Sequence, residues 1–126
     1  MDAQLDMSVQ VEDVEYLRHG DRKLLATIYR PAGPGPFPGL LEVHGGGWTK
    51  NDRLHNSRIA RGVAARGVMV ASIDFRMPPD ADYPNGMSDI HFGIRWLKAN
   101  ARRFGSTPEK IGSWGASSGG HQVLLL

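Results

Sequence analysis

The chain has 126 residues, enough for one domain at most, and its 40% hydrophobic and 22% charged residues are typical of a soluble globular protein. The formal net charge is only +2 and the basic residues are scattered, which excludes a concentrated nucleic-acid-binding face. The absence of cysteine excludes disulfides and thiolate chemistry, and no apolar run approaches the roughly 18 residues of a membrane span. Because the amino terminus lacks a secretory signal, we expect a cytoplasmic protein.

The first part of the sequence predicts a β-hairpin followed by a short strand. Residues 9–16 and 24–29 are rich in β-forming side chains, and the polar stretch between them predicts an antiparallel pair. Prolines and glycines in residues 31–38 exclude regular structure and predict a surface loop. The apolar run 40–43 then predicts a strand that leads directly into H-G-G-G-W, residues 44–48.

The middle of the chain predicts a helix and a central strand. Residues 54–66 form the expected helix, with Gly67 as its carboxy-terminal cap. Residues 68–74 are almost continuously apolar, as in a parallel strand that is buried on both faces. An irregular, proline-containing loop follows over residues 76–84.

The last part predicts a second amphipathic helix, a strand and the start of a third helix. Apolar residues recur at steps of three and four, which is the buried stripe of a helix: Met87, Ile90, Ile94, Leu97 and Ala101. Residues 111–114 predict a short strand, and a helix is expected from Gly119 onward. A hairpin followed by alternating strands and helices indicates the α/β class, with three parallel strands.

A glycine-rich turn after the last strand predicts a nucleophilic serine. Gly115-Ala-Ser-Ser-Gly119 fits the pattern G-x-S-x-G in one register only, with Ser117 at its centre. A sharp strand-to-helix turn needs neighbours without side chains, and the following helix directs its positive amino-terminal end at developing negative charge. A glycine-rich turn with a chance serine is the alternative interpretation, but the strand before it and the apolar helix after it favour the nucleophile.

The run from His44 to Trp48 is a candidate oxyanion hole. Its three glycines, Gly45, Gly46 and Gly47, expose backbone N–H groups that can converge on an oxyanion, and without Cβ atoms they allow close approach of a substrate. A flexible surface loop is the alternative, and it is disfavoured because the run follows a strand directly and ends in tryptophan. Since both motifs follow parallel strands, we expect them at the same carboxy-terminal edge of the sheet.

These residues resemble the α/β-hydrolase superfamily, specifically the hormone-sensitive-lipase-like esterases and related bacterial carboxylesterases with their H-G-G-G and G-D-S-A-G-G motifs. Residues 73–80 are similar to the D-Y-R-L-A-P-E stretch of that family, and Tyr83-Pro84, Asp89 and residues 95–97 also match comparable positions. The resemblance covers residues 24–126 and the amino-terminal half of a typical member, so residues 1–126 are interpreted as one partial α/β-hydrolase domain that ends after the nucleophile turn.

The resemblance implies a role for each motif residue. It implies that Ser117 is the nucleophile and that the backbone N–H groups of Gly46, Gly47 and Ser118 form the oxyanion hole. Support of that loop and contact with the substrate pocket are implied for three neighbours: His44, Gly45 and Trp48. No cofactor or metal is implied. The expected activity is hydrolysis of small, short-acyl carboxylic esters.

Two positions depart from the lipase-like pattern. Ala116 stands where that pattern has aspartate, and Ser118 stands where it often has alanine. The sequence G-A-S-S-G-G-H is nearer to the bacterial esterase and formamidase-like branches. A formamidase or peptidase of the same fold therefore stays open as an alternative to an esterase.

A catalytic acid and histidine are not evident in this chain. In this fold they follow the nucleophile in chain order, and His121 is the only titratable residue after Ser117. His121 would sit on the helix just behind the serine, where packing around the glycine turn is the favoured interpretation. Asp74 is expected to order the loop around Arg76, and no acid partner is evident for the other histidines: His19, His55 and His91.

A serine without a base to take its proton is a poor nucleophile, so this chain alone is expected to be inactive. Its last strand would present an unpaired edge, which predicts a dimer or completion of the sheet by a carboxy-terminal segment. The non-enzymatic alternative is an inactive remnant that acts only as a binding or assembly module.

Overall fold

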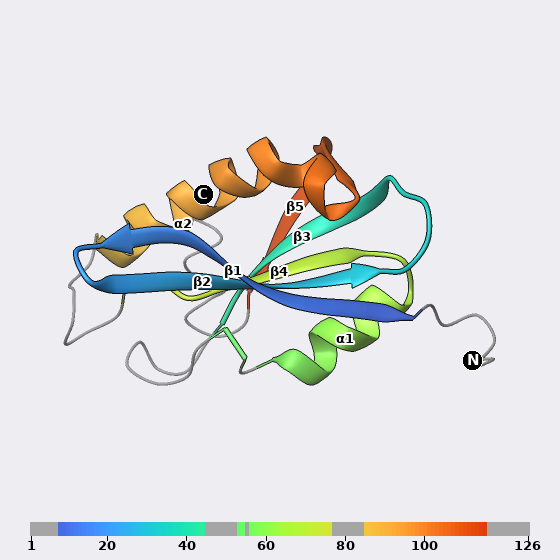
Figure 1. Cartoon of the computed structure of the whole chain (residues 1–126), viewed down its shortest axis with the longest axis horizontal. Coiled ribbons are helices and arrows are strands. Elements are labelled where there is room, and N and C mark those ends of the chain that lie inside the picture. The colour runs from blue at the N-terminus through green and yellow to red at the C-terminus, as the bar shows by residue number, and fades with distance from the viewer. Residues whose placement is uncertain (1–7, 45–52, 55, 77–84, 116–126) are drawn as a thin grey trace.

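A computed structural model describes residues 8–44, 53–54, 56–76 and 85–115. Five strands and two α-helices make up these residues (Figure 1). In chain order the elements are β1 (Val9–His19), β2 (Arg22–Pro31), β3 (Phe37–Val43), α1 (Ser57–Ala65), β4 (Met69–Ile73), α2 (Asn85–Asn100), the short 3₁₀ helix η2 (Ala101–Phe104) and β5 (Ser106–Gly115).

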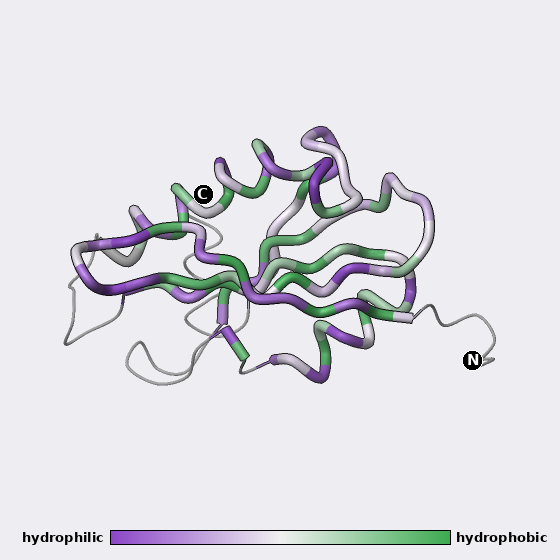
Figure 2. Tube along the Cα trace, in the orientation of Figure 1, coloured by the Kyte–Doolittle hydropathy of each residue, from purple (hydrophilic) through white to green (hydrophobic). Residues whose placement is uncertain are grey.

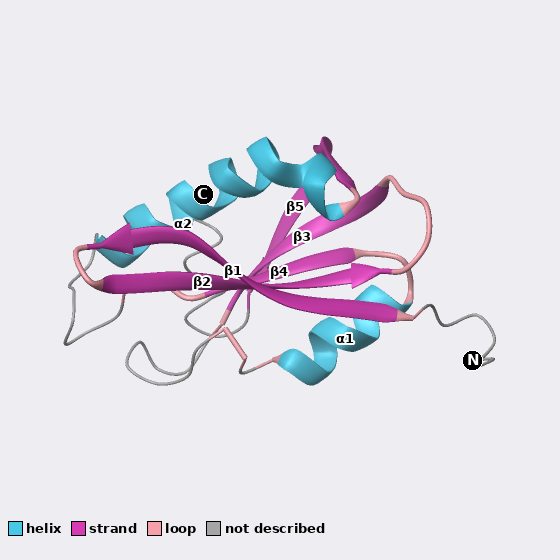
Figure 3. Cartoon of the chain, in the orientation of Figure 1, coloured by secondary structure: helices cyan, strands magenta, loops and turns pink. Residues whose placement is uncertain are grey.

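The strands form one mixed sheet in the order β1-β2-β4-β3-β5. β1 and β2 are an antiparallel hairpin, β2 is antiparallel to β4, and β3 is parallel to both β4 and β5. The connection from β3 to β4 crosses the sheet in one direction, and the connection from β4 to β5 returns across β3 in the other. Right-handed crossovers therefore place α1 and α2 on opposite faces, as Figure 3 shows.

The larger part of the core lies between the sheet and α2. Alternate residues of the strands, including Leu41, Val43 and Ile73, pack there against Ile90 and Leu97 of the helix, and all five are fully buried. A smaller cluster under α1 contains Tyr29, Val70, Ala60 and Ala64. Figure 2 shows the central strands as largely hydrophobic and the tip of the β1–β2 hairpin as more polar. Strands that are covered on both faces account for the continuous apolar run of β4.

The predicted fold class, with a hairpin followed by three parallel strands and intervening helices, is confirmed. The predicted ends of several elements were wrong. β5 begins at Ser106 rather than at Ile111, because an irregular segment pairs with Phe37 before the regular ladder starts at Ile111 and Gly39. Pro108 lies in that irregular segment, where a missing ladder hydrogen bond is tolerated.

The helices also start and stop differently from the prediction. α1 begins at Ser57 instead of Leu54, because the Leu54 carbonyl accepts the Ser57 N–H at 3.1 Å in a turn. Gly67 ends α1 as predicted, with φ of 98° and its N–H bonded to the Ala64 carbonyl at 3.0 Å. Ala101 is buried as predicted but lies in η2 rather than in α2. The helix expected from Gly119 lies outside the described residues.

No helix in the described ranges combines the length and hydrophobicity that crossing a membrane requires.

Candidate active site

The strands that precede the two sequence motifs end side by side. β3 and β5 are adjacent and parallel, and Val43 is the register partner of Gly115. On the other side of β3, Val43 also pairs with Ile73, the last residue of β4. The chain therefore leaves these three strands at one edge of the sheet, where sites in open α/β folds gather.

Most of the predicted site residues lie outside the described residues. These are the nucleophile and oxyanion residues together with the two loop residues: Ser117, Ser118, Gly45, Gly46, Gly47 and Trp48. Their roles stay predictions. His44 is described, and its exposed fraction is only 1%. Its imidazole stacks on the ring of Phe75, with centroids 4.5 Å apart and an angle of 24° between the planes. The stack joins the residue after β3 to the segment after β4.

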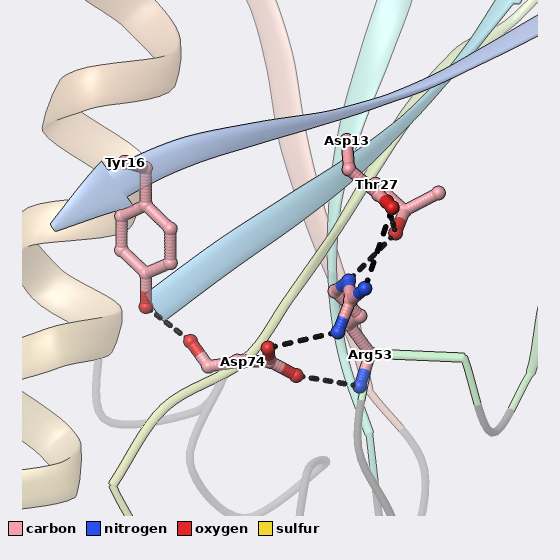
Figure 4. Close-up of polar contacts among 5 residues, drawn as sticks. All are labelled: Asp13, Tyr16, Thr27, Arg53 and Asp74. Carbon is pink, nitrogen blue, oxygen red and sulfur yellow. Dashed lines mark hydrogen bonds and ion pairs between the residues drawn. The ribbon is translucent and has the colours of Figure 1, made fainter. Parts of the chain in front are cut away.

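Asp74 pairs with Arg53, and the expectation that it orders the loop around Arg76 stays a prediction because residues 77–84 lie outside the described residues. The Arg53 backbone N–H donates to Asp74 Oδ1 at 3.0 Å, and the guanidinium Nη1 donates to Oδ2 at 3.1 Å (Figure 4). The sequence did not predict this partner, because Arg53 lies 21 residues before Asp74. Both carboxylate oxygens of Asp74 are thus occupied by one arginine.

The Arg53 guanidinium also reaches the hairpin. Its Nε donates to the hydroxyl of Thr27 on β2 at 2.9 Å, and its Nη2 lies 3.4 Å from Asp13 Oδ2 on β1. Thr27 in turn donates to Asp13 Oδ1 at 2.6 Å. The pKa of Asp13 is held below its usual value, mainly by the hydrogen bond from the Thr27 hydroxyl and to a smaller extent by Arg53. Burial alone would lower the pKa of Arg53. The carboxylates of Asp74 and Asp13 outweigh this effect, so the pKa of Arg53 is raised.

The main chain of Asp74 is held as firmly as its side chain. Its N–H donates to the Leu25 carbonyl at 2.9 Å, and its carbonyl accepts a hydrogen bond from the hydroxyl of Tyr16 on β1. Burial raises the pKa of Tyr16 well above its usual value, so this hydroxyl stays protonated and donates. Asp74 is therefore fixed at the sheet edge by contacts from β1, β2 and Arg53.

A second polar cluster is centred on Asp89 of α2, whose side chain is 1% exposed. Arg76 donates to it from its backbone N–H at 2.8 Å and from Nε and Nη2 at 2.9 and 3.0 Å. His19, at the end of β1, lies 2.9 Å away through Nε2. The expectation that His19 has no acid partner was wrong, because folding brings together residues 70 positions apart.

Two further histidines without an evident acid partner in the sequence are His91 and His55. His91 is partly buried on α2, and no acid partner for it is found among the described residues. His55 lies outside the described residues. Within the described ranges, no group of three or more histidine and carboxylate residues is arranged to hold a metal ion.

Sequence reasoning missed Glu42, a fully buried carboxylate two residues before His44. It lies on the face of β3 opposite Leu41 and Val43, beside Ser72 of β4. Desolvation raises the pKa of Glu42 to about 7, and Asn56 at the start of α1 offsets this only partly. Neither carboxylate oxygen makes a hydrogen bond of ordinary geometry to a described residue. The signal was a single charge inside the apolar run L-L-E-V.

Comparison with known proteins places the chain in a family. Residues 26–126 match the family model BD-FAE, so the chain belongs to the BD-FAE family. It is 38% identical over 102 residues to a versiconal hemiacetal acetate esterase of Dothistroma septosporum, a match that covers 79% of this chain and 31% of that protein. It is 35% identical over 92 residues to the carboxylesterase NlhH of Mycobacterium tuberculosis, covering 71% and 28%.

Solved structures with the same fold are α/β-hydrolase esterases. A hyperthermophilic esterase from Pyrobaculum calidifontis superposes with a TM-score of 0.84 and 27% identity, over 96% of this chain and 38% of that one. A bacterial heroin esterase superposes with a TM-score of 0.83 and 25% identity, over 98% and 39%. The fold is therefore the amino-terminal part of an α/β-hydrolase, in a family of carboxylic-ester hydrolases. The chain spans about a third of the length of the curated relatives it matches.

Proposed function

We propose that this chain carries the nucleophile and the oxyanion-binding loop of a carboxylic-ester hydrolase. The observation that carries the proposal is the pairing of Val43 with Gly115, because it starts the H-G-G-G and G-x-S-x-G segments from neighbouring strand ends. In the proposed reaction the Ser117 hydroxyl attacks the ester carbonyl. The oxyanion accepts hydrogen bonds from the backbone N–H groups of Gly46, Gly47 and Ser118.

The proposal assigns the general base and its acid partner to residues outside the described part of the chain. Two aspartates near the described sheet edge are already engaged, Asp74 by Arg53 and Asp89 by Arg76 and His19. An aspartate that orients a catalytic histidine needs a free oxygen for the imidazole N–H, and Asp74 has none because Arg53 donates to both of its oxygens. The contacts of Asp74 and Asp89 support a structural role for each.

A short-acyl ester is the proposed substrate class. One relative is named an acetate esterase, and one esterase of known structure, 25% identical to this chain, holds butyrate. Both names concern acyl groups of a few carbon atoms. An aryl acetate or aryl butyrate is therefore a suitable first substrate, since its release of a phenol is easily followed.

The proposal is tested on the longest natural form of the protein by intact-mass measurement and an aryl acetate assay. We expect a fluorophosphonate to add once, and fragmentation to place the adduct on Ser117 rather than on Ser118. Ser117→Ala should abolish both labelling and hydrolysis, whereas Ser88→Ala, an exposed serine on α2, should leave both unchanged. Loss of a catalytic serine lowers the rate by about 10⁴-fold or more.

The same experiment separates the alternatives. Ala116 and Ser118 resemble the formamidase-like branch, so an aryl formamide and a peptide substrate are assayed beside the ester. Faster Ser117-dependent turnover of the formamide would replace esterase with formamidase. A folded protein that neither labels nor turns over any of these substrates would favour the inactive binding module.

A further inference from the structure

Arg53 connects the end of the glycine-rich loop to three strands. It is the first described residue after residues 45–52, and its side chain is only 15% exposed. It reaches β1 through Asp13, β2 through Thr27 and the end of β4 through Asp74 (Figure 4). These contacts use every nitrogen of the guanidinium, and the Arg53 backbone N–H adds a further bond to Asp74.

The other end of the same loop is also fixed. His44 is buried and stacked on Phe75, which directly follows Asp74 in the chain. The loop therefore leaves the sheet at one residue that packs against Phe75 and returns at one residue that binds Asp74. In general, fixing both ends of a chain segment lowers its conformational entropy, and donors that are held in place before a reaction need not reorganise during it.

Resting on the proposed function, we infer that Arg53 is a positioning residue for the oxyanion-binding loop, acting through Asp74, Asp13 and Thr27. It touches neither the ester nor Ser117 in this scheme. Its effect is on the placement of the Gly46 and Gly47 N–H groups. A misplacement of about 1 Å by a change distant from the chemistry can lower a rate about 100-fold.

The geometry requires arginine and not only a positive charge. The guanidinium is planar, and its Nε, Nη1 and Nη2 point to three different acceptors. Lysine would bring the charge on one nitrogen at the end of a flexible stem, so it could reach only part of this set. The kcat and the boronate affinity of Arg53→Lys are therefore expected to lie between those of wild type and those of Arg53→Gln.

The experiment measures kcat, KM and inhibition by an alkyl boronic acid, whose tetrahedral serine adduct mimics the oxyanion. In Arg53→Gln we expect kcat to fall by about 10- to 100-fold and boronate affinity to fall in parallel, while KM stays within about threefold. Arg18→Gln is the matched control, because Arg18 bonds only Glu15 in an exposed pair among the described contacts. Its kinetic constants should equal those of wild type.

A second readout keeps the inference separate from the proposed function. Hydrogen–deuterium exchange of residues 44–53 should be faster in Arg53→Gln than in Arg18→Gln, with the strands equally protected in both. Unchanged kcat in a folded Arg53→Gln, or an effect on KM alone, overturns the inference while Ser117-dependent activity upholds the proposed function. If wild type hydrolyses nothing, the proposed function fails, and equal exchange in both variants then also overturns the positioning role.

Discussion

Asp89 receives three hydrogen bonds from Arg76, which lies 13 residues earlier in the chain. The pair joins the segment after β4 to α2, and His19 adds the β1–β2 hairpin to the same carboxylate. Arg53 makes a comparable connection with Asp74, the residue that directly follows β4. Each carboxylate thus joins parts of the chain that the sheet hydrogen bonds leave independent.

Replacing Asp89 by alanine tests the first of these connections. The change leaves Arg76 and His19 without this acceptor, and we expect the free energy of unfolding to fall by about 3 kcal/mol. This is the lower end of the effect of breaking a buried ion pair, because the Arg76 side chain is 21% exposed and can regain water. Urea titration measures the change, with Asp21→Ala in the exposed hairpin turn as the control. An equal effect of the two changes would contradict the prediction.

The sheet and its helices could be predicted because their signals are local. Alternation, apolar runs and the i, i+3, i+4 stripe of α2 depend on residues close in sequence, and these patterns predicted every described strand and both α-helices. Element ends were less predictable. The start of β5 at Ser106 depends on Phe37 across the sheet, and the start of α1 depends on a turn at Leu54.

The polar contacts of the candidate site could not be predicted from neighbouring residues. Arg53 and Asp74 are 21 residues apart in the sequence, and His19 and Asp89 are 70 residues apart. They come into contact because the sheet order β1-β2-β4-β3-β5 brings distant segments to one edge. Only the position of the two glycine motifs after strands was evident beforehand. The contacts on either side of the glycine-rich loop, those of His44 with Phe75 and of Arg53 with Asp74, could be identified only in the folded structure.

Two glycines near the end of α1 provide a matched pair of opposite predictions. Gly67 has φ of 98°, a conformation that strains an L-residue, so Gly67→Ala should lower the free energy of unfolding by about 1–2 kcal/mol. Gly62 lies inside α1, and a Cβ there would meet no atom within 4 Å. Gly62→Ala should therefore raise the free energy of unfolding by about 0.5–1 kcal/mol. Urea titrations of both variants that shift in the same direction would contradict this account.

The Arg53–Asp74 pair should show energetic coupling in a double-mutant cycle. We expect Arg53→Gln and Asp74→Asn each to be destabilising, and the double variant to be more stable than the sum of the single effects predicts, by about 1–3 kcal/mol. Arg18→Gln with Glu15→Gln is the control cycle, and its coupling should be much smaller because that pair is exposed and screened. Additive effects at Arg53 and Asp74 would show that their hydrogen bonds contribute little to stability.

The pH dependence of stability should be dominated by Glu42 between about pH 4.5 and 7. In the folded protein the pKa of Glu42 is raised from 4.5 to about 7 by desolvation. The folded state therefore keeps a proton that the unfolded state releases in this range. The contribution is fully present below pH 4.5 and is lost as pH rises through about 7, by up to about 3 kcal/mol at about 1.4 kcal/mol per pKa unit.

Glu42→Gln isolates this contribution, because glutamine keeps the shape of the side chain and does not titrate. The free energy of unfolding is measured by urea titration at several pH values in wild type, Glu42→Gln and the exposed control Glu12→Gln. The lowered pKa of Asp13 acts in the opposite direction, since its stabilisation is lost as pH falls, but it is common to all three proteins. The difference between wild type and Glu42→Gln should therefore favour the variant increasingly from pH 4.5 to 7 and then become constant. A constant difference over the whole range would mean that Glu42 titrates alike in the folded and unfolded protein.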